Sequence, residues 1–256
     1  MNKYQLNLQV TENKSLDDRH VLIKLTDAKG SLPLMKAGQF VQVLVEDSSK
    51  TFLRRPISIN YVDKKNNELW LMIQKRGEGT HKIATLCKGS FLNVILPLGN
   101  GFNVPQNAKN ILLVGGGVGV APMLYLGKEL KEQGLSPKFL IGARNQNLLL
   151  EIDLFQQLGD VYITTEDGSI GEKGFVTQHS ILEEMKFDYI AVCGPKPMMV
   201  AVASYARKND IMCEVSLENM MACGLGACLC CVEKTVKGNI CVCTEGPVFN
   251  IKDLVW

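Results

Sequence analysis

The sequence predicts a multidomain protein with an antiparallel β-barrel, an α/β domain built on a parallel sheet, and a small C-terminal cysteine-rich module. Residues 1–101 contain short stretches rich in β-branched and aromatic residues, separated by turn residues, which is typical of a barrel. Residues 102–214 alternate between strand-like and helix-like stretches, as a parallel sheet with crossover helices requires. Residues 215–256 hold six of the nine cysteines.

The elements of the first part follow from periodicity and turn residues. Strands are expected at residues 1–10, 20–27, 39–47, 56–63, 68–75 and 89–99. One helix-like stretch, residues 79–86, interrupts them.

The elements of the second part alternate in type. Strands are expected at residues 110–117, 138–144, 160–167 and 188–195. Helices are expected at residues 121–134, 148–159, 174–185 and 195–209. Residues 211–218 then lead into the cysteine segment.

Composition narrows the class of protein. Hydrophobic residues make up 46% of the chain, so its cores do not need disulfide bonds. A net charge of +2, from 28 basic and 26 acidic residues, is too balanced to indicate nucleic acid or an anionic membrane as partner. The first residues alternate like a strand rather than a signal peptide, and no run is long enough to span a bilayer, so we expect a cytoplasmic protein. Cytoplasmic thiols stay reduced, which favours metal binding over disulfides.

A glycine-rich loop follows the first strand of the α/β part. Glycine allows the backbone to approach a pyrophosphate closely, and the following helix offers free N–H groups. A second candidate segment ends a later strand, and the carboxyl ends of parallel strands meet at one edge of a sheet. The candidate nucleotide-binding residues are Gly115, Gly116, Gly117, Gly119, Pro122 and Met123, with Cys193, Gly194 and Pro195. The alternative is a tight strand-to-helix turn that binds no ligand.

The barrel part carries two further candidates. Arg54 and Arg55 precede Pro56, Ile57 and Ser58, and the planar guanidinium of an arginine can hold a phosphate. Gly79 and Thr80 open the helix-like stretch, where an anion can bind. The alternative for each arginine is a solvated side chain.

The cysteines have informative spacing. Cys223, Cys228 and Cys231 follow the C-x4-C-x2-C pattern which, with a fourth cysteine further on, is typical of plant-type [2Fe–2S] proteins. Cys241 and Cys243 share one face of a strand, so geometry alone does not say which is the fourth ligand. The alternative is a zinc site at Cys228, Cys231, Cys241 and Cys243.

Together, these motifs resemble the ferredoxin–NADP reductase superfamily over roughly residues 1–215. The resemblance implies an FAD-binding barrel at 1–101, an NAD-binding domain at 102–214 and a cluster module at 215–256. It implies that Arg55 binds the FAD pyrophosphate with Gly79 and Thr80, and that Ser58 approaches flavin N5. Ile57 departs from the tyrosine of the family motif. The resemblance further implies that Met72, Ile73 and Gln74 line the flavin.

The C-terminal segment is similar to that of the electron-transfer subunits of class 1B dihydroorotate dehydrogenases. In that family the last ligand directly precedes an acidic-Gly-Pro-Val-Phe stretch, which here begins after Cys243 and Thr244. The resemblance therefore implies the ligands Cys223, Cys228, Cys231 and Cys243. Cys230 and Cys241 are then bystanders.

The resemblance also implies an activity. Electrons would enter from the FMN of a dihydroorotate-oxidising partner subunit, in pyrimidine biosynthesis, and pass through the [2Fe–2S] cluster and FAD to NAD+. We expect a hetero-oligomer with two copies of each subunit, and no dihydroorotate oxidation by this chain alone. No catalytic acid or base is expected. Two alternatives remain: a flavin and iron–sulfur reductase subunit of another NAD(P)-linked oxidoreductase, and a zinc-stapled nucleotide-binding regulator.

Overall fold

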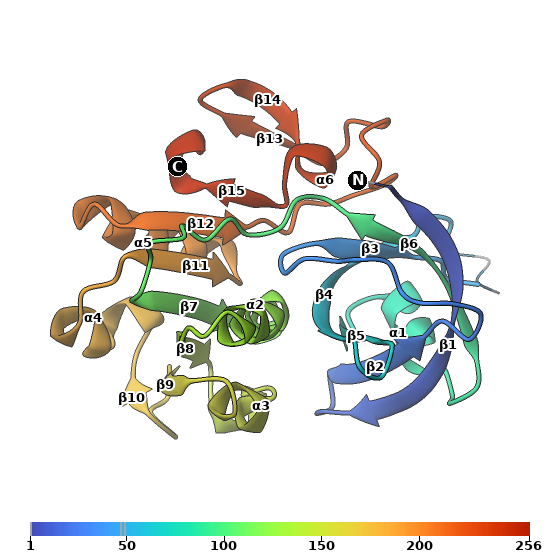
Figure 1. The fold of residues 1–256 in the computed structure, drawn as a ribbon, viewed down its shortest axis with the longest axis horizontal. Coiled ribbons are helices and arrows are strands. Elements are labelled where there is room, and N and C mark those ends of the chain that lie inside the picture. Colours follow the sequence, from blue (N-terminus) through green and yellow to red (C-terminus); the bar gives the residue numbers. More distant parts are fainter. Residues whose placement is uncertain (1, 47, 49) are drawn as a thin grey trace.

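The protein was analysed as a computed structural model that describes residues 2–46, 48 and 50–256. Figure 1 shows a barrel beside a twisted sheet, with the C-terminal segment above the junction between them. The barrel strands are β1 (Tyr4–Ser15), β2 (His20–Thr26), β3 (Phe40–Val43), β4 (Arg55–Asp63), β5 (Glu68–Gln74) and β6 (Phe91–Leu98). They close in the order β1-β2-β5-β4-β3-β6, and every pairing is antiparallel.

These strands confirm the predicted barrel, and α1 (Glu78–Ala84) occupies the predicted helix-like stretch. Met1 and Asp47, at the ends of two predicted strands, lie outside the described residues. The barrel closes because its strands turn alternate apolar side chains inward, such as Leu69, Leu71 and Ile73 of β5, which are fully buried.

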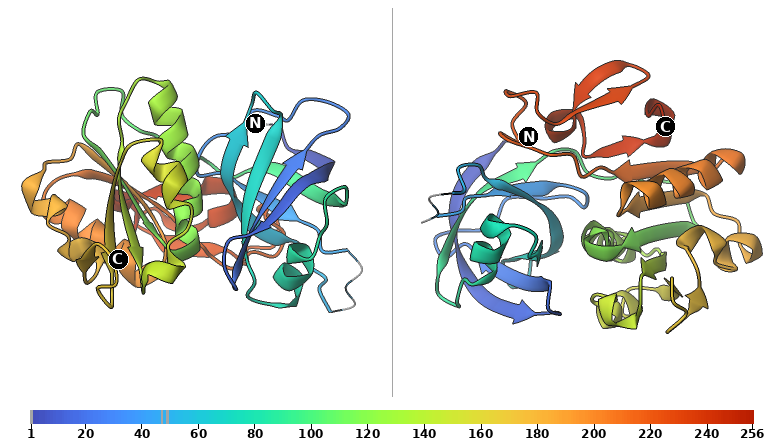
Figure 2. Two further views of the ribbon diagram at one scale, coloured as in Figure 1. Left: turned by 90° about the horizontal axis from the view of Figure 1, so that it is seen from below. Right: turned by 180° about the vertical axis from the view of Figure 1, so that it is seen from behind.

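The second sheet has the order β10-β9-β8-β7-β11-β12-β15. Its parallel strands are β7 (Ile111–Gly116), β8 (Lys138–Ala143), β9 (Asp160–Thr165), β10 (Glu172–Lys173), β11 (Tyr189–Cys193) and β12 (Met212–Ser216). Helices α2 (Val120–Glu132) and α3 (Ile152–Gln156) lie on the side toward the barrel, and α4 (Ile181–Glu184) and α5 (Lys196–Lys208) on the other side (Figure 2). The predicted parallel α/β sheet is thus confirmed.

Two predicted helices are much shorter than the sequence pattern suggested. The helix expected at 148–159 is reduced to α3, because Glu151 adopts a left-handed conformation with φ 55° that interrupts it. The helix expected at 174–185 is reduced to a 3₁₀ turn, Val176–Gln178, and α4, because His179 between them is extended. Short turns can also bury apolar residues that recur at helical spacing, so this spacing does not by itself require a continuous helix.

The cysteine segment starts where β12 ends and returns to the same sheet. A hairpin of β13 (Val232–Thr235) and β14 (Gly238–Cys241) leads into α6 (Val242–Glu245). Strand β15 (Val248–Asn250) then pairs antiparallel with β12. The module predicted at 215–256 therefore shares a strand with the sheet, and its separate boundary stays a prediction.

Polar contacts from buried atoms join the barrel to the sheet. The Tyr125 hydroxyl of α2 donates to the Met35 carbonyl at 3.0 Å. The Glu129 carboxylate accepts from the Ala37 backbone N–H at 3.2 Å. These contacts hold α2 against the segment that precedes β3. No helix among the described residues is long and apolar enough to cross a membrane.

Candidate functional site

Arg55 begins β4, and its guanidinium lies over the first turn of α1. Its Nε would stand 2.9 Å from a Cβ placed on Gly79, so a side chain at 79 would displace the guanidinium. Its Nη1 donates to the Leu53 carbonyl at 2.8 Å. Thr80 Oγ1 accepts from the backbone N–H groups of Arg76 at 2.9 Å and Gly77 at 3.1 Å. The structure therefore brings together the three residues predicted to hold a pyrophosphate, and a guanidinium beside a side-chain-free backbone suits a phosphate.

Arg54 points elsewhere. Its Nη1 donates to the carbonyls of Gln42 and Asn93, both at 3.2 Å, and its Nη2 donates to Asn93 Oδ1 at 2.6 Å. Burial lowers the pKa of its guanidinium, an effect that Glu46 opposes. Arg54 thus braces β3 against β6, and Arg55 alone of the pair reaches α1.

The residues predicted to line a flavin lie on two neighbouring strands. Pro56, Ile57 and Ser58 are half-buried in β4, which pairs with β5 through Ile59 and Leu71. In β5, Met72 is buried, Ile73 is fully buried in the barrel core and Gln74 is half-buried. A planar ring lying along these strands would meet Ser58 and the C-terminal end of β5, whereas the Ile73 side chain is buried in the barrel core.

The two nucleotide motifs meet at one edge of the sheet. The register pairs Gly115 at the end of β7 with Cys193 at the end of β11. A Cβ on Gly119 would stand 2.5 Å from the Cys193 carbonyl oxygen, and one on Gly194 would stand 3.0 Å from the Gly116 carbonyl oxygen. The loops pack so closely that only glycine fits at these positions.

The glycines of the loop have two different roles. A Cβ on Gly116 would stand 2.6 Å from Met198 Sδ and 3.3 Å from Pro195 Cδ, so Gly116 serves packing. Gly117 is exposed, has φ 56°, and has nothing within 4 Å of a Cβ position. Its backbone faces the open space where a ligand can approach. Pro122 and Met123 lie buried in α2 and support the loop from below.

The Cys193 thiol is buried behind this edge. Burial raises its pKa well above the ordinary value, and the carboxylate of Glu218 raises it further. Desolvation raises the pKa of Glu218 in turn, an effect that Arg76 opposes. No sequence pattern pointed to Glu218, because its proximity to Cys193 depends on the turn after β12.

The cysteine loop places the sulfur atoms of Cys223, Cys228, Cys231 and Cys243 within hydrogen-bond distance of backbone N–H groups. The Cys223 N–H donates to Cys228 Sγ at 3.5 Å, and the Leu225 N–H donates to Cys223 Sγ at 3.3 Å. The Gly226 N–H donates to Cys243 Sγ at 3.2 Å. N–H groups directed at sulfur are what thiolate ligands of an iron–sulfur cluster require.

The fourth predicted ligand closes this arrangement. The Cys243 N–H donates to Cys231 Sγ at 3.4 Å, and both side chains are buried. Burial and the neighbouring Cys231 thiol raise the pKa of Cys243 to about 12. At Cys223 burial also raises the pKa, but the N–H donors of Leu225 and Cys228 outweigh it and lower the value to about 6.

The other two cysteines differ from this set. Cys230 is exposed. Cys241 is half-buried, and desolvation and the nearby Cys231 raise the pKa of its thiol. Within the described part of the chain, no three His, Cys, Asp or Glu side chains are placed as ligands of one metal ion. The assignment of Cys223, Cys228, Cys231 and Cys243 stays a prediction, which the donor set and its N–H groups fit.

Left-handed glycines allow the loop to turn. Gly224 has φ 69° and Gly226 has φ 86°. A Cβ on Gly224 would stand 2.6 Å from Gln42 Cγ of the barrel, and one on Gly226 would stand 2.7 Å from Thr244 Cγ2. The loop is therefore held between β3 and α6.

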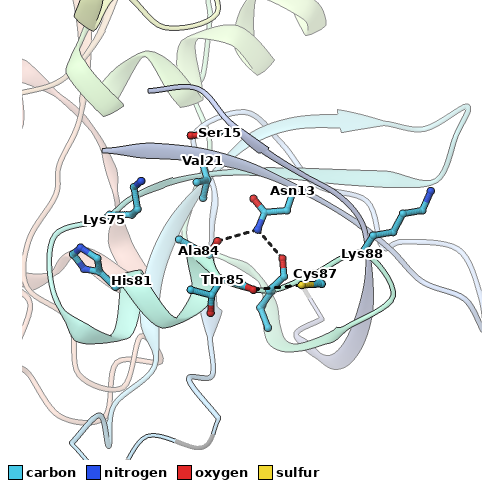
Figure 3. Close-up of a pocket in the computed structure, with 10 residues that line it drawn as sticks. Asn13, Ser15, Val21, Lys75, His81, Ala84, Thr85, Cys87 and Lys88 are labelled. Atoms are coloured by element: carbon cyan, nitrogen blue, oxygen red, sulfur yellow. Dashed lines mark hydrogen bonds between the residues drawn. The ribbon is translucent and has the colours of Figure 1, made fainter. Parts of the chain in front are cut away.

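A wide, open groove of about 630 Å³ lies away from these residues, on the outside of the barrel (Figure 3). It is lined by Lys75, His81 and Lys88 among others, and Asn13 Nδ2 crosses it to donate to the carbonyls of Ala84 at 3.0 Å and Leu86 at 2.7 Å. None of the predicted site residues lines it, so this groove belongs to the packing of α1 on the barrel.

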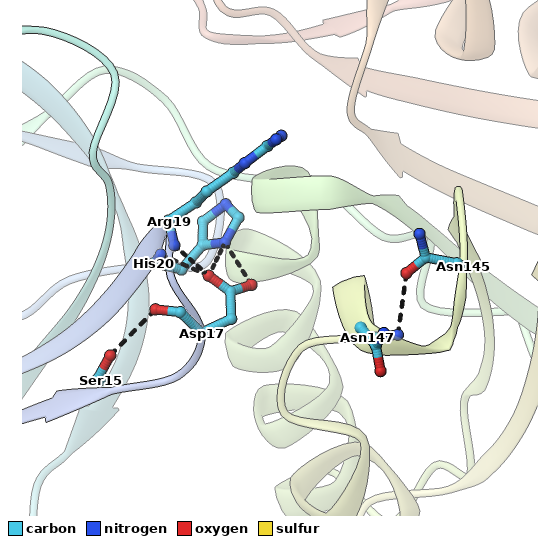
Figure 4. Close-up of polar contacts among 6 residues, drawn as sticks. All are labelled: Ser15, Asp17, Arg19, His20, Asn145 and Asn147. Atoms are coloured by element: carbon cyan, nitrogen blue, oxygen red, sulfur yellow. Dashed lines mark hydrogen bonds and ion pairs between the residues drawn. The ribbon is translucent and has the colours of Figure 1, made fainter.

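Local turns order the loops of the two halves (Figure 4). Asp17 Oδ1 accepts from the N–H groups of Arg19 at 2.6 Å and His20 at 2.7 Å, and Asp17 Oδ2 lies 2.9 Å from His20 Nδ1. Across the view, Asn145 Oδ1 accepts from the Asn147 N–H at 3.1 Å. These contacts shape the turn between β1 and β2 and the loop after β8.

Comparison with known proteins adds an independent line of support. The family model of the iron–sulfur cluster binding domain of dihydroorotate dehydrogenase B matches residues 218–255. The electron transfer subunit of dihydroorotate dehydrogenase B (NAD+) from Caldanaerobacter subterraneus subsp. tengcongensis is 41% identical over 234 residues, which cover 89% of this chain and 90% of that protein. The subunit of the same name from Bacillus pumilus is 36% identical over 254 residues, 96% of each chain.

Solved structures agree. An NADH-dependent reduced ferredoxin–NADP oxidoreductase is 27% identical with a TM-score of 0.87, covering 98% of this chain and 90% of that one. Phthalate dioxygenase reductase shares the fold, with a TM-score of 0.69 at 19% identity, covering 93% of this chain and 94% of that one. The identity to the curated relatives over nearly the full length shows that the chain belongs to the family of dihydroorotate dehydrogenase B (NAD+) electron transfer subunits.

Proposed function

We propose that this chain carries electrons from the FMN of a dihydroorotate-oxidising partner subunit to NAD+, through a [2Fe–2S] cluster and FAD. One observation carries the proposal: the three candidate sites adjoin one another in a single chain. The cysteine loop packs through Gly224 on β3 of the barrel. Strand β3 pairs with the start of β4, which bears Arg55. The glycine loop follows β7, and the sheet continues from β7 through β11 to β12. Strand β12 leads directly into the cysteine segment.

The barrel residues bind and orient FAD. Arg55, with the backbone at Gly79 and Thr80, holds the pyrophosphate, and the Thr80 hydroxyl caps the helix through Gly77. Pro56, Ile57 and Ser58 lie along one side of the ring system, and the edge of β5 at 72–74 borders it. When bound, FAD exchanges single electrons with a cluster and a hydride with a nicotinamide, so it belongs between them.

The sheet residues bind NAD+. Gly117 presents its backbone to the dinucleotide. Gly116 and Gly119 let the loop pack against Cys193, Gly194 and Pro195, and Gly115 leaves room for Val120 at the start of α2. Hydride transfer itself requires no proton donor or acceptor, so the role of these residues is to bind and orient the dinucleotide.

The cysteine loop holds the cluster through Cys223, Cys228, Cys231 and Cys243. We further propose a hetero-oligomer with two copies of each subunit, in the cytoplasm. The printed name of the curated relatives supports the partner, since an electron transfer subunit serves a catalytic one. The cysteines are all free, which suits a reducing compartment.

A second candidate is a reductase subunit of another NAD(P)-linked oxidoreductase. The likeness to the NADH-dependent reduced ferredoxin–NADP oxidoreductase, which covers 98% of this chain, favours it. The two candidates differ in the partner and the electron donor, not in the cofactors of this chain.

The test is to purify the chain anaerobically with its co-purifying partner. We expect about one FAD and two irons per chain, with little zinc. The complex should reduce NAD+ with dihydroorotate, and the chain without its partner should not. A zinc-filled, colourless chain would contradict the cofactor assignment. A coloured complex that is inert to dihydroorotate but active with another donor would favour the second candidate.

A further inference from the structure

The side chain of Gln42 is a buried amide without a partner. Gln42 is fully buried in β3, and neither its Nε2 nor its Oε1 has a hydrogen-bond partner among the described residues. A buried polar group left without a hydrogen bond destabilises the folded protein. Its backbone carbonyl, by contrast, accepts from Arg54. The carboxamide therefore requires a partner that the described residues do not provide.

The carboxamide lies against the cysteine loop. A Cβ on Gly224 would stand 2.9 Å from Gln42 Cδ and 2.6 Å from Cγ, and its nearest neighbour would be Nε2. Gly224 directly follows Cys223 in sequence, and the Leu225 N–H already donates to Cys223 Sγ. The amide is thus directed at the turn that presents the first predicted ligand.

Gln42 also adjoins the flavin motif. In the register of β3 and β4, Gln42 is opposite Pro56 and Val43 is opposite Arg55. In Figure 1 the cysteine segment passes above β3 and β6 at the top of the barrel. The side chain therefore spans the boundary between the strands proposed to hold FAD and the loop proposed to hold the cluster.

We propose that Gln42 is a positioning residue of the iron–sulfur site, whose carboxamide N–H donates a hydrogen bond to a sulfur atom on the Cys223 side of the cluster. The proposal rests on the proposed function, since it requires the cluster. Reduction places an additional negative charge on the cluster and its sulfur ligands. A donor directed at them stabilises the reduced form and raises the reduction potential.

The first experiment replaces the donor. Gln42→Met keeps a long unbranched side chain of similar size but removes the N–H donor without adding a charge. Removal of one such bond should lower the ratio of reduced to oxidised cluster at a fixed potential by about three- to tenfold. Tenfold corresponds to 59 mV for a one-electron couple. Redox titration followed by electron paramagnetic resonance measures this shift without any turnover.

The matched control is Asn60→Leu. Asn60 is another fully buried barrel amide with an unpartnered oxygen, but its Nδ2 donates to Glu151 at 3.1 Å, away from the cysteine loop. The cluster potential of this variant should equal that of the wild type. A Gln42→Met protein with full iron content and an unchanged potential would overturn the proposal, and so would an equal shift in the Asn60 control.

A second measurement uses the wild-type complex and does not depend on variants that assemble poorly. With ¹⁵N-glutamine labelling, the reduced cluster should show hyperfine coupling to a side-chain amide nitrogen. Absence of that coupling would overturn the proposal. Failure of the proposed function has a different signature, because iron would then be missing from the wild type, or the cluster would be present while dihydroorotate did not reduce it.

Discussion

At the scale of single residues, the two adjacent arginines have different roles because their side chains point in different directions. Arg55 reaches Gly79 in the first turn of α1, and Arg54 makes three hydrogen bonds to β3 and β6. Neighbours on a strand point to opposite sides, so one residue of the pair is available to a ligand and the other is not. The guanidinium of Arg54 therefore stabilises the barrel strands and is not available to a ligand.

We therefore expect Arg55→Ala to weaken FAD binding more than Arg54→Ala. Loss of a charge-assisted contact to phosphate costs about 1.5–3 kcal/mol, roughly ten- to a hundredfold in affinity. Arg54→Ala should mainly lower the unfolding midpoint, because it leaves the Gln42 and Asn93 acceptors unpaired. FAD content per folded chain and thermal unfolding separate the two effects. Equal FAD retention in both variants would argue against the motif alignment.

The cysteines give a second prediction at this scale. Replacing Cys223, Cys228, Cys231 or Cys243 by serine should lose or cripple the cluster. Cys230→Ser and Cys241→Ser are the matched controls, and both should keep about two irons per chain. Iron content and the visible spectrum of anaerobic protein measure the result. Loss of the cluster in Cys241→Ser together with its survival in Cys243→Ser would reverse the assignment of the fourth ligand.

At the scale of elements, the segment before α3 is tied to β4 of the barrel by a buried carboxyl group. Asn60 Nδ2 of β4 donates to Glu151 Oε1 at 3.1 Å, and Glu151 Oε2 is shielded from water without a partner among the described residues. Burial raises the pKa of Glu151 to about 7, and the Asn60 hydrogen bond opposes the rise only in part. The interface thus contains a carboxyl group that is easier to bury when protonated.

The raised pKa of Glu151 makes the folded protein more stable in mildly acidic solution than at neutral pH. With a folded pKa near 7 and an ordinary value of 4.5, the folded state binds more protons between these pH values. The free energy of unfolding should therefore fall as pH rises from about 4.5 to 7, by about 1–3 kcal/mol, and stay lower above pH 7.

Glu151→Gln should remove this dependence and make the protein more stable than the wild type at pH 8. Urea unfolding at pH 5 and pH 8 tests it. The control is Glu183→Gln, an exposed glutamate on α4 that should change neither midpoint appreciably. If the free energy of unfolding of Glu151→Gln fell between pH 5 and pH 8 by as much as that of the wild type, another group would be responsible.

At the scale of the whole molecule, the two ends of the proposed electron path lie on separate elements. The nicotinamide edge is formed by β7, β11 and the loops after them, and the cluster loop lies against β3 and α6. FAD, held by β4, β5 and α1, lies between them in the proposal. The two halves of the path should therefore be separable by mutation.

We expect Cys243→Ser to abolish dihydroorotate-driven NAD+ reduction in the complex but to leave electron transfer from NADH to artificial acceptors largely intact. The second reaction needs only the nicotinamide edge and FAD. Arg55→Ala, which acts on FAD, should reduce both reactions together. A Cys243→Ser complex that loses both activities with full FAD content would contradict this order of cofactors.

The sequence by itself determined the parts of this protein that depend on local pattern. Alternating apolar residues predicted the barrel strands, and alternating element types predicted the parallel sheet, because both reflect which face of an element is buried. The glycine loop and the spacing of Cys223, Cys228 and Cys231 could also be recognised in the sequence, because each lies within a short continuous segment.

Only the tertiary structure decided what depends on contacts between distant segments. It showed that Gly117 faces open space while Gly116 is packed under Met198, and that Glu151 interrupts a helix. It also brought β15 back to the sheet, and Gln42 to the cysteine loop. No local sequence pattern predicts these outcomes. Whether a residue is buried at an interface depends on the shapes of both packed surfaces, and the local sequence describes only one of them.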